Sequence, residues 1–400
     1  MRLLVTTNAR LWKAENNQYY TPLVYGYEFF KRYLSVFETI RLVAHVEKAS
    51  DEDVKKMLLV SGPGLEVFEM PFPHGAKAYL KDARTIGRLA KDCIKGCDAA
   101  LFRVPDPLAF QIFPKARKAQ MPIAIEVTSD PLELYSAKGG RYPLRLFIKW
   151  SHYWELKLCC KKAHCVSYVT STYLQSVYPS GIKDGDNTRF ESHYTTAGID
   201  EHDNPVREYP ITGKITLLHV SGSIAGKVKG HKELIESFVE LRKQGFELQL
   251  VLAGGGKLDD DIAFTLEKSG YKDDVTFTGL VGKERLALLY KESDVFVFPS
   301  YREGLPRVVI EAMSWGLPCV CSDIPGCREL LPSEELVPIK DTNALTNHLR
   351  ELLSSPGLME EESRLNAKES KQYLQSAINK VRLAFYMNLK RLAGGNSLVR

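Results

Sequence analysis

Short apolar segments alternate with longer amphipathic segments along the whole chain, and this alternation limits the possible folds more than any other feature. In the N-terminal half it predicts strands at 2–7, 39–46, 98–103, 122–127 and 164–169, and helices at 23–37, 82–96, 107–119 and 143–162. In the C-terminal half it predicts strands at 215–220, 247–253, 274–277, 294–298 and 317–321, and helices at 229–244, 259–269, 283–292, 305–316 and 342–354. Strand–helix alternation builds right-handed βαβ units around a parallel sheet. We therefore predict an α/β chain with two doubly wound, Rossmann-like domains in tandem.

A polar stretch at residues 200–213 separates the two series of elements. It contains two prolines, five charged side chains and little apolar periodicity. The chain has 400 residues, enough for two or three domains of ~150 residues each. We therefore predict an N-terminal domain over 1–205 and a C-terminal domain over 213–374, followed by a helical tail.

The composition excludes several classes of protein. The chain is 44% hydrophobic and 26% charged, which is typical of a soluble globular protein. No apolar run approaches the ~18–20 residues of a membrane-spanning helix, and the N-terminus becomes polar too early for a secretory signal. The eight cysteines form no CxxC pair and no zinc spacing, so we expect reduced thiols in a cytoplasmic protein.

Residues 220–232 combine glycines with cations after a predicted strand. The glycines, which permit tight turns and a close approach of a ligand to the backbone, are Gly222, Gly226 and Gly230, and the cationic candidates are Lys227, Lys229, His231 and Lys232. Cations at a helix N-terminus oppose the macrodipole unless an anion binds there. The spacing excludes a Walker A loop. Two interpretations stay open at this point, a phosphate site and a solvated basic loop.

The segment 300–320 places two glutamates around a predicted helix start. Glu303 and Glu311 are eight residues apart, or about 12 Å along a helix, whereas glycosidase acid–base pairs lie ~5–9.5 Å apart. This spacing favours two carboxylates that hold opposite ends of one extended ligand through its hydroxyls. Free amides near Gly304, Leu305 and Arg307 could hold a phosphate between them. The alternative is that both glutamates are ordinary surface residues.

These motifs resemble the retaining group 1 glycosyltransferases, also called glycosyltransferase family 4. The segments HVSGS, KGHKELIESF, LVLAGGG, VTFTGLV, SDVFVFPS, EGLPRVVIEAM and GLPCVCSD stand in the order and spacing of that family. The resemblance is specific over 215–330 and weaker over 1–200. It implies the GT-B fold, in which two Rossmann-like domains face each other across a cleft. It also implies that the helix at about 375–400 packs back on the N-terminal domain.

The resemblance also implies roles for individual residues. Glu311 would bind the nucleotide ribose, and Glu303 would contact the transferred sugar and act in catalysis together with Lys229. The leaving diphosphate of a UDP- or GDP-linked sugar would meet Lys229 and the amides from Gly304 to Arg307, with no metal and no cofactor. The remaining donor-binding candidates, which include the expected contacts to the base, are Gly222, Ser223, Lys227, Gly254, Leu280, Val281, Leu305 and Pro306.

Three departures from the family concern charge and the acceptor side. Ser223 stands where the family has an arginine, so Lys227 or Arg307 would have to compensate. Asp130 follows a predicted strand where many members carry a histidine–aspartate pair, and it is a candidate for a catalytic role near the acceptor or sugar, with Glu126 as its rival. An aromatic, amide-rich loop at 8–26 carries Tyr19 and Tyr20, which would either stack on a saccharide acceptor or anchor the loop.

Residues 141–162 form a basic, aromatic stretch with Glu155 as its acid. Such a helix can lie on an anionic membrane surface, or it can pack its aromatic side chains on the N-terminal sheet. No nucleic-acid-reading motif supports a third interpretation, and we expect no nucleic acid partner.

The sequence thus predicts a cytoplasmic, peripherally membrane-associated hexosyltransferase. It would move a sugar from a nucleotide-sugar to a lipid-linked or saccharide acceptor in cell-surface polysaccharide or glycan biosynthesis. Two alternatives stay open: another GT-B enzyme such as a nucleotide-sugar epimerase, and a catalytically silent protein that binds a nucleotide-sugar.

Overall fold

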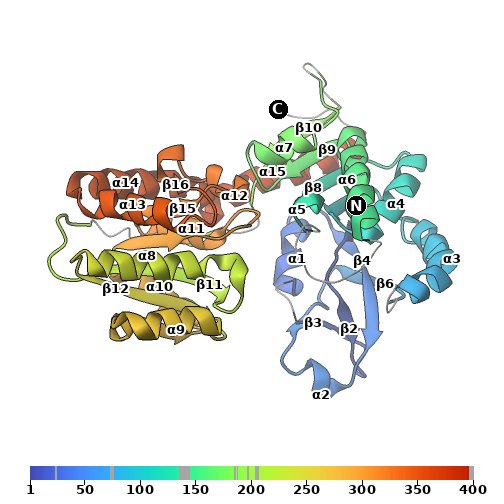
Figure 1. Cartoon of the computed structure of the whole chain (residues 1–400). Coiled ribbons are helices and arrows are strands. Elements are labelled where there is room, and N and C mark those ends of the chain that lie inside the picture. Colours follow the sequence, from blue (N-terminus) through green and yellow to red (C-terminus); the bar gives the residue numbers. More distant parts are fainter. Residues whose placement is uncertain are drawn as a thin grey trace. The chain divides into compact units, whose positions relative to one another are not determined.

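A computed structural model of the chain contains two compact units, Met1–Tyr194 with Asn379–Arg400, and Thr195–Ile378 (Figure 1). The residues that it describes are 1–22, 25–72, 76–134, 145–183, 186, 188–195, 198–202 and 207–395. The described part of the predicted linker, 200–202 and 207–213, belongs to the second unit. Ile199, just before it, pairs with Tyr373 and Gln375 through backbone hydrogen bonds of 3.0 and 2.8 Å. Arg207 is also tied there, donating to the carbonyls of Trp315, Ser293 and Tyr290.

The first unit is built on a sheet whose strand order is β10-β9-β8-β7-β1-β4-β2-β3-β5, with β6 paired to β4. Its parallel strands are β1 (Arg2–Thr6), β2 (Leu11–Lys13), β4 (Thr39–Lys48), β6 (Leu65–Met70), β7 (Ala99–Val104), β8 (Ile123–Val127), β9 (Cys165–Tyr168) and β10 (Phe190–His193). Strands β7 and β8 are buried along their whole length, as expected for a parallel sheet covered on both faces.

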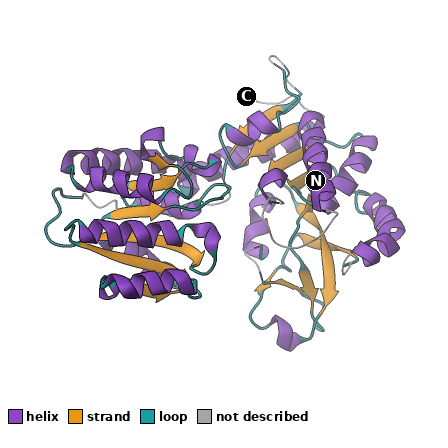
Figure 2. Ribbon diagram, in the orientation of Figure 1, coloured by secondary structure: helices purple, strands orange, loops and turns teal. Residues whose placement is uncertain are grey.

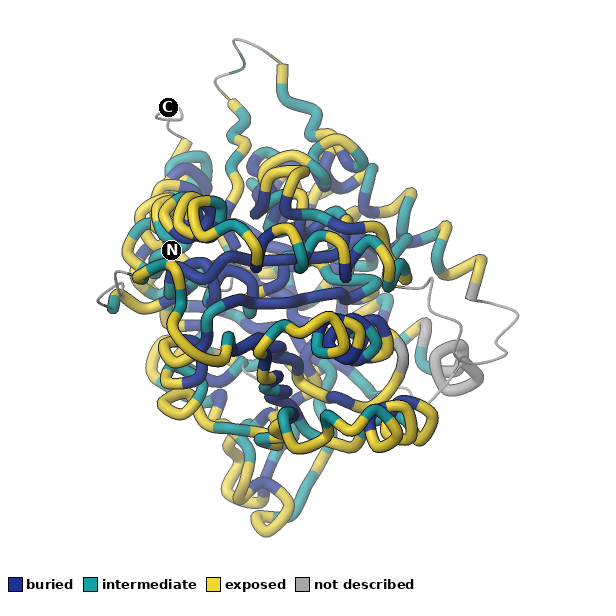
Figure 3. The backbone as a smooth tube through the Cα atoms, turned by 60° about the vertical axis from the view of Figure 1, so that its left-hand side comes forward, coloured by how far each residue is buried: buried dark blue, intermediate teal, exposed yellow. Residues whose placement is uncertain are grey.

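Helices cover both faces of this sheet. The larger core cluster takes side chains from the elements α4 (Pro107–Lys118), α6 (Arg145–Lys162) and α7 (Tyr173–Val177) and from the end of α3 (Ala76–Asp92). Buried side chains of α1 (Tyr27–Leu34) and of the C-terminal helix α15 (Gln375–Ala393) pack together, with the rings of Tyr33 and Tyr386 4.9 Å apart. The tail of the chain therefore completes the N-terminal unit. In Figure 3 the buried segments lie at the centre of the molecule, and exposed segments lie mostly toward the outside.

The segment 8–26 is not the loop that we predicted. It contains β2 (Leu11–Lys13) and β3 (Tyr19–Thr21), an antiparallel pair in which Trp12 faces Tyr20, and β3 also pairs with β5 (Leu58–Leu59). Asn17 occupies the turn with a φ of 60°, a left-handed conformation that asparagine tolerates. Strands of two or three residues are too short to show a period-two pattern, so the sequence does not reveal them.

The second unit contains a six-stranded sheet of order β13-β12-β11-β14-β15-β16 (Figure 2). Its strands, all paired in parallel, are β11 (Ile215–Ser223), β12 (Leu248–Gly255), β13 (Val275–Gly279), β14 (Val295–Phe298), β15 (Cys319–Ser322) and β16 (Leu336–Val337). Strand order reverses between β11 and β14, which makes their carboxyl ends the switch point where ligands of doubly wound sheets bind.

Helices on the two faces of this sheet belong to separate core clusters. One cluster is formed with α8 (His231–Lys243), α9 (Asp260–Ser269) and α13 (Thr342–Leu353), and α14 (Pro356–Glu369) adds Met359. The other is formed with α10 (Lys283–Glu292), α11 (Arg307–Ser314) and α12 (Pro325–Arg328). The predicted α/β class with parallel sheets is confirmed. No helix among the described residues is long and apolar enough to cross a membrane.

Candidate functional site

The candidate donor site lies at the carboxyl ends of β11 and β14. The loop after β11 ends in a short 3-10 helix, Lys227–Lys229, followed by Gly230 with a φ of 71°. A Cβ atom on Gly230 would lie 2.0 Å from the carbonyl oxygen of Pro299, so only glycine permits this contact. Tyr301 donates its backbone N–H to the Val228 carbonyl at 2.8 Å, which fixes the two loops together.

This contact brings Lys229 and Glu303 together. The Lys229 ammonium pairs with Glu303 Oε1 and lies 5.9 Å from the centre of the Phe298 ring. Both side chains are about a quarter exposed, so solvent or a ligand can reach them. The two predicted catalytic residues are therefore adjacent, and each carries the charge that a phosphate or a sugar hydroxyl would engage.

The N-terminus of α11 lies directly after Glu303. Its N-cap is Pro306, no side chain caps the helix and its first turn carries no acid, so the amides at the start of the helix keep their capacity to bind an anion. Gly326 of α12 supports this loop, because a Cβ atom there would lie 1.8 Å from the Gly304 carbonyl oxygen. We did not single out Gly326 from the sequence, since a glycine in a short loop carries no distinctive signal.

Glu311 of α11 lines a cavity. Its Oε2 accepts a hydrogen bond from the buried Tyr290 hydroxyl at 3.0 Å, and its Oε1 accepts one from Arg307 Nε at 2.8 Å. The cavity has a volume of about 170 Å³ and is lined by Ile199, Asp200, Glu201, His202, Lys283, Leu286, Ala287, Tyr290, Arg307, Glu311, Ser314 and Trp315.

Residues 199–202 form one wall of this cavity. The His202 ring stacks on Trp315 with centroids 4.0 Å apart, and its Nε2 lies 2.9 Å from Ser314 Oγ. Asp200 forms an ion pair with Lys283 at the start of α10. No sequence pattern indicates these contacts, because the partners lie 83 and more residues apart and the segment resembles a linker.

The other residues predicted for the donor site have different local roles in the structure. Ser223 Oγ accepts the Ala225 amide at 3.1 Å, which shapes the turn beside the exposed Gly222. Gly254 serves close packing, since a Cβ atom there would lie 2.5 Å from the Ser221 carbonyl oxygen. Leu280 is exposed and Val281 half-buried after β13, while the side chain of Lys227 lies outside the described residues.

The predicted cation cluster at the start of α8 is smaller than expected. His231 is buried, and burial lowers its pKa, which disfavours its charged form. Its ring packs edge-on against that of buried His219 at 4.9 Å. Burial also lowers the pKa of His219, to about 3. Lys232 is exposed and lies 3.7 Å from Glu236, so Lys229 is the described lysine that the structure places beside Glu303.

Two acidic candidates of the first unit have their carboxylate oxygens engaged within the protein. Asp130 is buried, and it accepts hydrogen bonds from the hydroxyls of Tyr173 and Tyr178 and from the Leu132 amide. This geometry shows that Asp130 holds β8 and α7 together, and its predicted role near the acceptor or sugar stays a prediction.

Glu126 forms a denser network. It accepts from Arg103 Nη1 at 2.5 Å and from the hydroxyls of Tyr194, Tyr386 and Tyr33 at 2.7, 2.8 and 3.2 Å. Burial alone would raise the pKa of Glu126, but Arg103 and the tyrosine hydroxyls outweigh it and hold the pKa below its ordinary value. Glu126 is therefore a buried anchor for α15 and does not present a free carboxylate to an acceptor.

The two tyrosines predicted for the acceptor lie on the β2–β3 hairpin. Tyr19 donates its hydroxyl to Glu69 at 2.7 Å, and Tyr20 donates to Gln18 at 3.0 Å. A polar hollow of about 560 Å³ next to this hairpin is lined by Lys13, Ala14, Glu15, Asn17, Lys48, Ala49, Ser50, Asp53 and Glu69. Both tyrosines anchor the hairpin, and their contact with an acceptor stays a prediction.

Comparison with known proteins shows which proteins this part of the chain is similar to. Residues 207–372 match the family model of glycosyl transferases group 1. The chain is similar to Protein CapJ of Staphylococcus aureus, with 23% identity over 393 residues that cover 98% of this chain and 96% of CapJ. It is also similar to the UDP-Gal:alpha-D-GlcNAc-diphosphoundecaprenol alpha-1,3-galactosyltransferase of Escherichia coli, with 36% identity over 111 residues that cover 25% of this chain and 26% of that enzyme.

Among solved structures, a sucrose-phosphate synthase from Thermosynechococcus elongatus matches with a TM-score of 0.62 and 18% identity, covering 99% of this chain and 100% of that chain. This likeness identifies the fold as GT-B. The match over 207–372, which contains Lys229, Glu303 and Glu311, makes this part of the chain similar to the group 1 glycosyltransferases.

Proposed function

We propose that this glycosyltransferase moves a hexose from a nucleotide-diphosphate-sugar to a lipid-linked or saccharide acceptor, with retention of the anomeric configuration. The observation that carries the proposal is the meeting of Lys229 and Glu303 beside the uncapped start of α11. A cation, a row of uncapped amides and a carboxylate are the groups that a diphosphate attached to a hydroxyl-rich ring requires.

In the proposed reaction the bond between the anomeric carbon and the diphosphate oxygen breaks. The acceptor oxygen attacks the same face of that carbon, and its proton passes to the leaving diphosphate. Lys229 and the α11 amides stabilise the negative charge that develops on the diphosphate, and Glu303 orients the sugar through its hydroxyls. No step requires a metal or another cofactor, so we expect transfer to continue in excess chelator.

Glu311 is proposed to hold the nucleotide ribose. Its two oxygens are oriented by Tyr290 and Arg307 at the rim of the cavity, and a carboxylate held in this way can accept hydrogen bonds from two vicinal hydroxyls. Arg307 is half exposed, so it can also turn toward the diphosphate and supply the charge missing at Ser223. Whether the base is uracil or guanine is the first thing to measure.

The acceptor proposal rests on relatives. The name of the Escherichia coli galactosyltransferase includes a UDP-linked donor and a diphosphoundecaprenol acceptor. By analogy, we place the present chain in cell-surface polysaccharide or glycan biosynthesis, in the cytoplasm and peripherally on the inner face of the membrane where a lipid-linked acceptor would be reached.

The decisive experiment has two stages. UDP-, GDP- and ADP-sugars are first screened for thermal stabilisation of the full chain, since a ligand that binds the folded state raises the melting temperature. The best donor is then incubated with lipid-linked and soluble saccharide acceptors while release of nucleoside diphosphate is measured. Transfer with a retained anomeric centre supports the proposal. Tight donor binding without turnover on any acceptor would instead identify a silent nucleotide-sugar-binding protein.

A further inference from the structure

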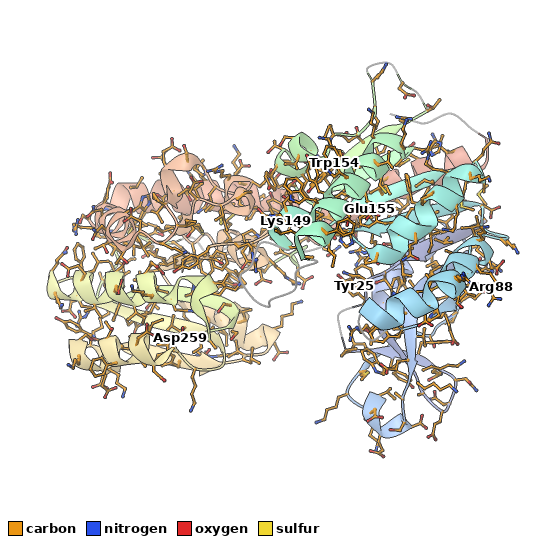
Figure 4. The ribbon with its side chains drawn as sticks, turned by 45° about the vertical axis from the view of Figure 1, so that its right-hand side comes forward. Tyr25, Arg88, Lys149, Trp154, Glu155 and Asp259 are labelled. Carbon is orange, nitrogen blue, oxygen red and sulfur yellow. The ribbon has the colours of Figure 1, made fainter. Side chains whose placement is uncertain are left out.

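Helix α6 exposes a row of large apolar side chains that the core does not use. Figure 4 labels Lys149, Trp154 and Glu155 on this helix. The exposed fractions are 68% for Leu146, 71% for Phe147, 51% for Trp150, 61% for Trp154 and 49% for Leu158. We call these five residues the α6 outer face. Exposed apolar patches of this kind mark interaction sites.

The α6 outer face lies opposite the side of the helix that packs on the sheet. At ~100° per residue, Leu146, Trp150, Trp154 and Leu158 recur every fourth position and share one side. The opposite side is already filled by buried residues, among them His152, Leu156, Cys159 and Cys160. The alternative of a helix that packs its aromatic side chains on the sheet therefore holds for Tyr153, which lies 5.5 Å from the Tyr178 ring, and is wrong for the two tryptophans.

Cations accompany the apolar side chains. Lys149, Lys157, Lys161 and Lys162 lie on the same helix, and the acid in its described part is Glu155. Lys157 Nζ lies 5.5 and 5.6 Å from the ring centres of Tyr153 and Trp154, so a cation and an indole share the edge of the patch. Arg141 and Tyr142 of the predicted basic stretch lie outside the described residues.

This combination selects one kind of partner. Tryptophan and phenylalanine flanked by lysines fit the interface of a bilayer, where rings enter the acyl boundary and ammonium groups meet anionic headgroups. A second copy of the chain would bring two sets of these lysines together, and like charges oppose such a contact. A neutral protein groove would satisfy the aromatic rings and leave the lysines unpaired.

We propose that the α6 outer face docks the N-terminal unit onto an anionic lipid bilayer. This proposal names the surface through which the protein would bind the membrane. Only the purpose of that contact, which is access to a lipid-linked acceptor, rests on the proposed function. The contact is a property of α6 and can be measured without donor, acceptor or turnover.

The test uses the full chain and two kinds of vesicle, pure phosphatidylcholine and phosphatidylcholine mixed with the anionic lipid phosphatidylglycerol. We expect co-sedimentation with the anionic vesicles and little with the neutral ones. The triple variant Phe147→Ser, Trp150→Ser, Trp154→Ser removes the apolar contact, and Lys157→Glu, Lys161→Glu, Lys162→Glu reverses the charge. Each lysine near an anionic surface contributes about a fivefold change in affinity, so the charge-reversal variant should bind at least ~20-fold more weakly. The apolar variant loses the burial of three aromatic rings, and a loss of at least ~20-fold is expected for it as well.

The matched control is Lys243→Glu, Lys268→Glu, Lys291→Glu, which reverses exposed lysines on α8, α9 and α10 with the same change in net charge. It should bind anionic vesicles within a fewfold of the wild type. Brominated lipids should quench the tryptophan emission of the wild type and lose most of that effect in Trp150→Phe, Trp154→Phe, a conservative pair that preserves packing. Retained melting temperatures establish that the variants fold.

Several outcomes would overturn the proposal. These are absence of binding to anionic vesicles, equal loss in the control variant, and unquenched emission in the presence of brominated lipid. A change in oligomeric state in the apolar variant, with vesicle binding intact, would instead assign the face to a second copy. Thermal stabilisation by the nucleotide-sugar is measured in parallel, and it would be unaffected if only the docking surface were wrongly assigned.

Discussion

The pairing of Lys229 with Glu303 predicts that substitutions of these two residues have different effects on diphosphate binding. In the free protein these side chains neutralise each other. In the proposed reaction the nucleoside diphosphate needs the lysine and not the glutamate, whereas the transferred sugar needs the glutamate. Lys229→Met should therefore weaken diphosphate binding, and Glu303→Gln should retain or strengthen it, although both should reduce transfer.

The magnitudes follow from what each change removes. Lys229→Met deletes a charge-assisted hydrogen bond of ~1.5–3 kcal/mol, which is about 10- to 150-fold in Kd for the nucleoside diphosphate. It also leaves the Glu303 carboxylate facing the phosphate, which adds repulsion. Glu303→Gln frees the ammonium from a partly exposed pair that is itself worth ~0–1 kcal/mol, so the diphosphate should bind equally well or up to about fivefold more tightly.

The assay is calorimetric titration with the nucleoside diphosphate that stabilises the protein most, and then with the intact nucleotide-sugar. For the Glu303→Gln variant we expect retained diphosphate binding and a turnover reduced at least ~100-fold. The double variant distinguishes coupling from addition. Equal weakening of diphosphate binding in both single variants would refute the assignment, because it would mean that Glu303 contributes to the phosphate site or to its fold.

Three further predictions concern stability. Glu126→Gln leaves the buried Arg103 without its charge partner and should lower the free energy of unfolding by ~3–5 kcal/mol in a urea titration; an intact stability with lost acceptor binding would restore Glu126 to the site. Gly230→Ala forces a side chain into the Pro299 carbonyl at a φ of 71°, so both the melting temperature and donor affinity should fall, and unchanged values would show that the loop adjusts. Burial raises the pKa of Glu335 to about 8 and, together with the charge of Glu361, that of Glu362 to about 7. These folded-state values exceed the unfolded ones, so unfolding should become easier as pH rises from about 5 to 8, and Glu362→Gln should flatten this slope; an identical slope in the variant would contradict it.

The helices and strands that frame the donor site can be predicted from the sequence because each is long enough to show its own period. Helix α10 begins and ends where the pattern predicts, at Lys283 and Glu292. The hairpin of β2 and β3 escapes prediction because each strand has three residues. Strand β16 has two residues and escapes prediction for the same reason.

The residues of the candidate site also differ in how far the sequence predicts their positions. Lys229 follows β11 and Glu303 follows β14, and the carboxyl ends of these neighbouring parallel strands meet where the strand order reverses. The topology therefore brings the two residues together although they lie 74 residues apart. Asp130 is ambiguous in the sequence because a carboxylate after a strand suits a ligand and a buried network equally well. The side chains that decide between these possibilities, Tyr173 and Tyr178, lie 43 and 48 residues away.

Glu126 illustrates this limit most clearly, because one of its partners, Tyr386, lies 260 residues along the chain. Local pattern holds no information about such a pair. The sequence does contain one indication. Arg103 in β7 and Glu126 in β8 are the charged residues of strands that are otherwise apolar, so neither has a charged partner within its own strand. Adjacent parallel strands at matched register put these two charges side by side. An acid within an apolar strand, with a cation at the paired position of the next strand, is therefore better interpreted as an internal anchor than as a catalytic residue, because a buried charge is tolerated only where a partner neutralises it.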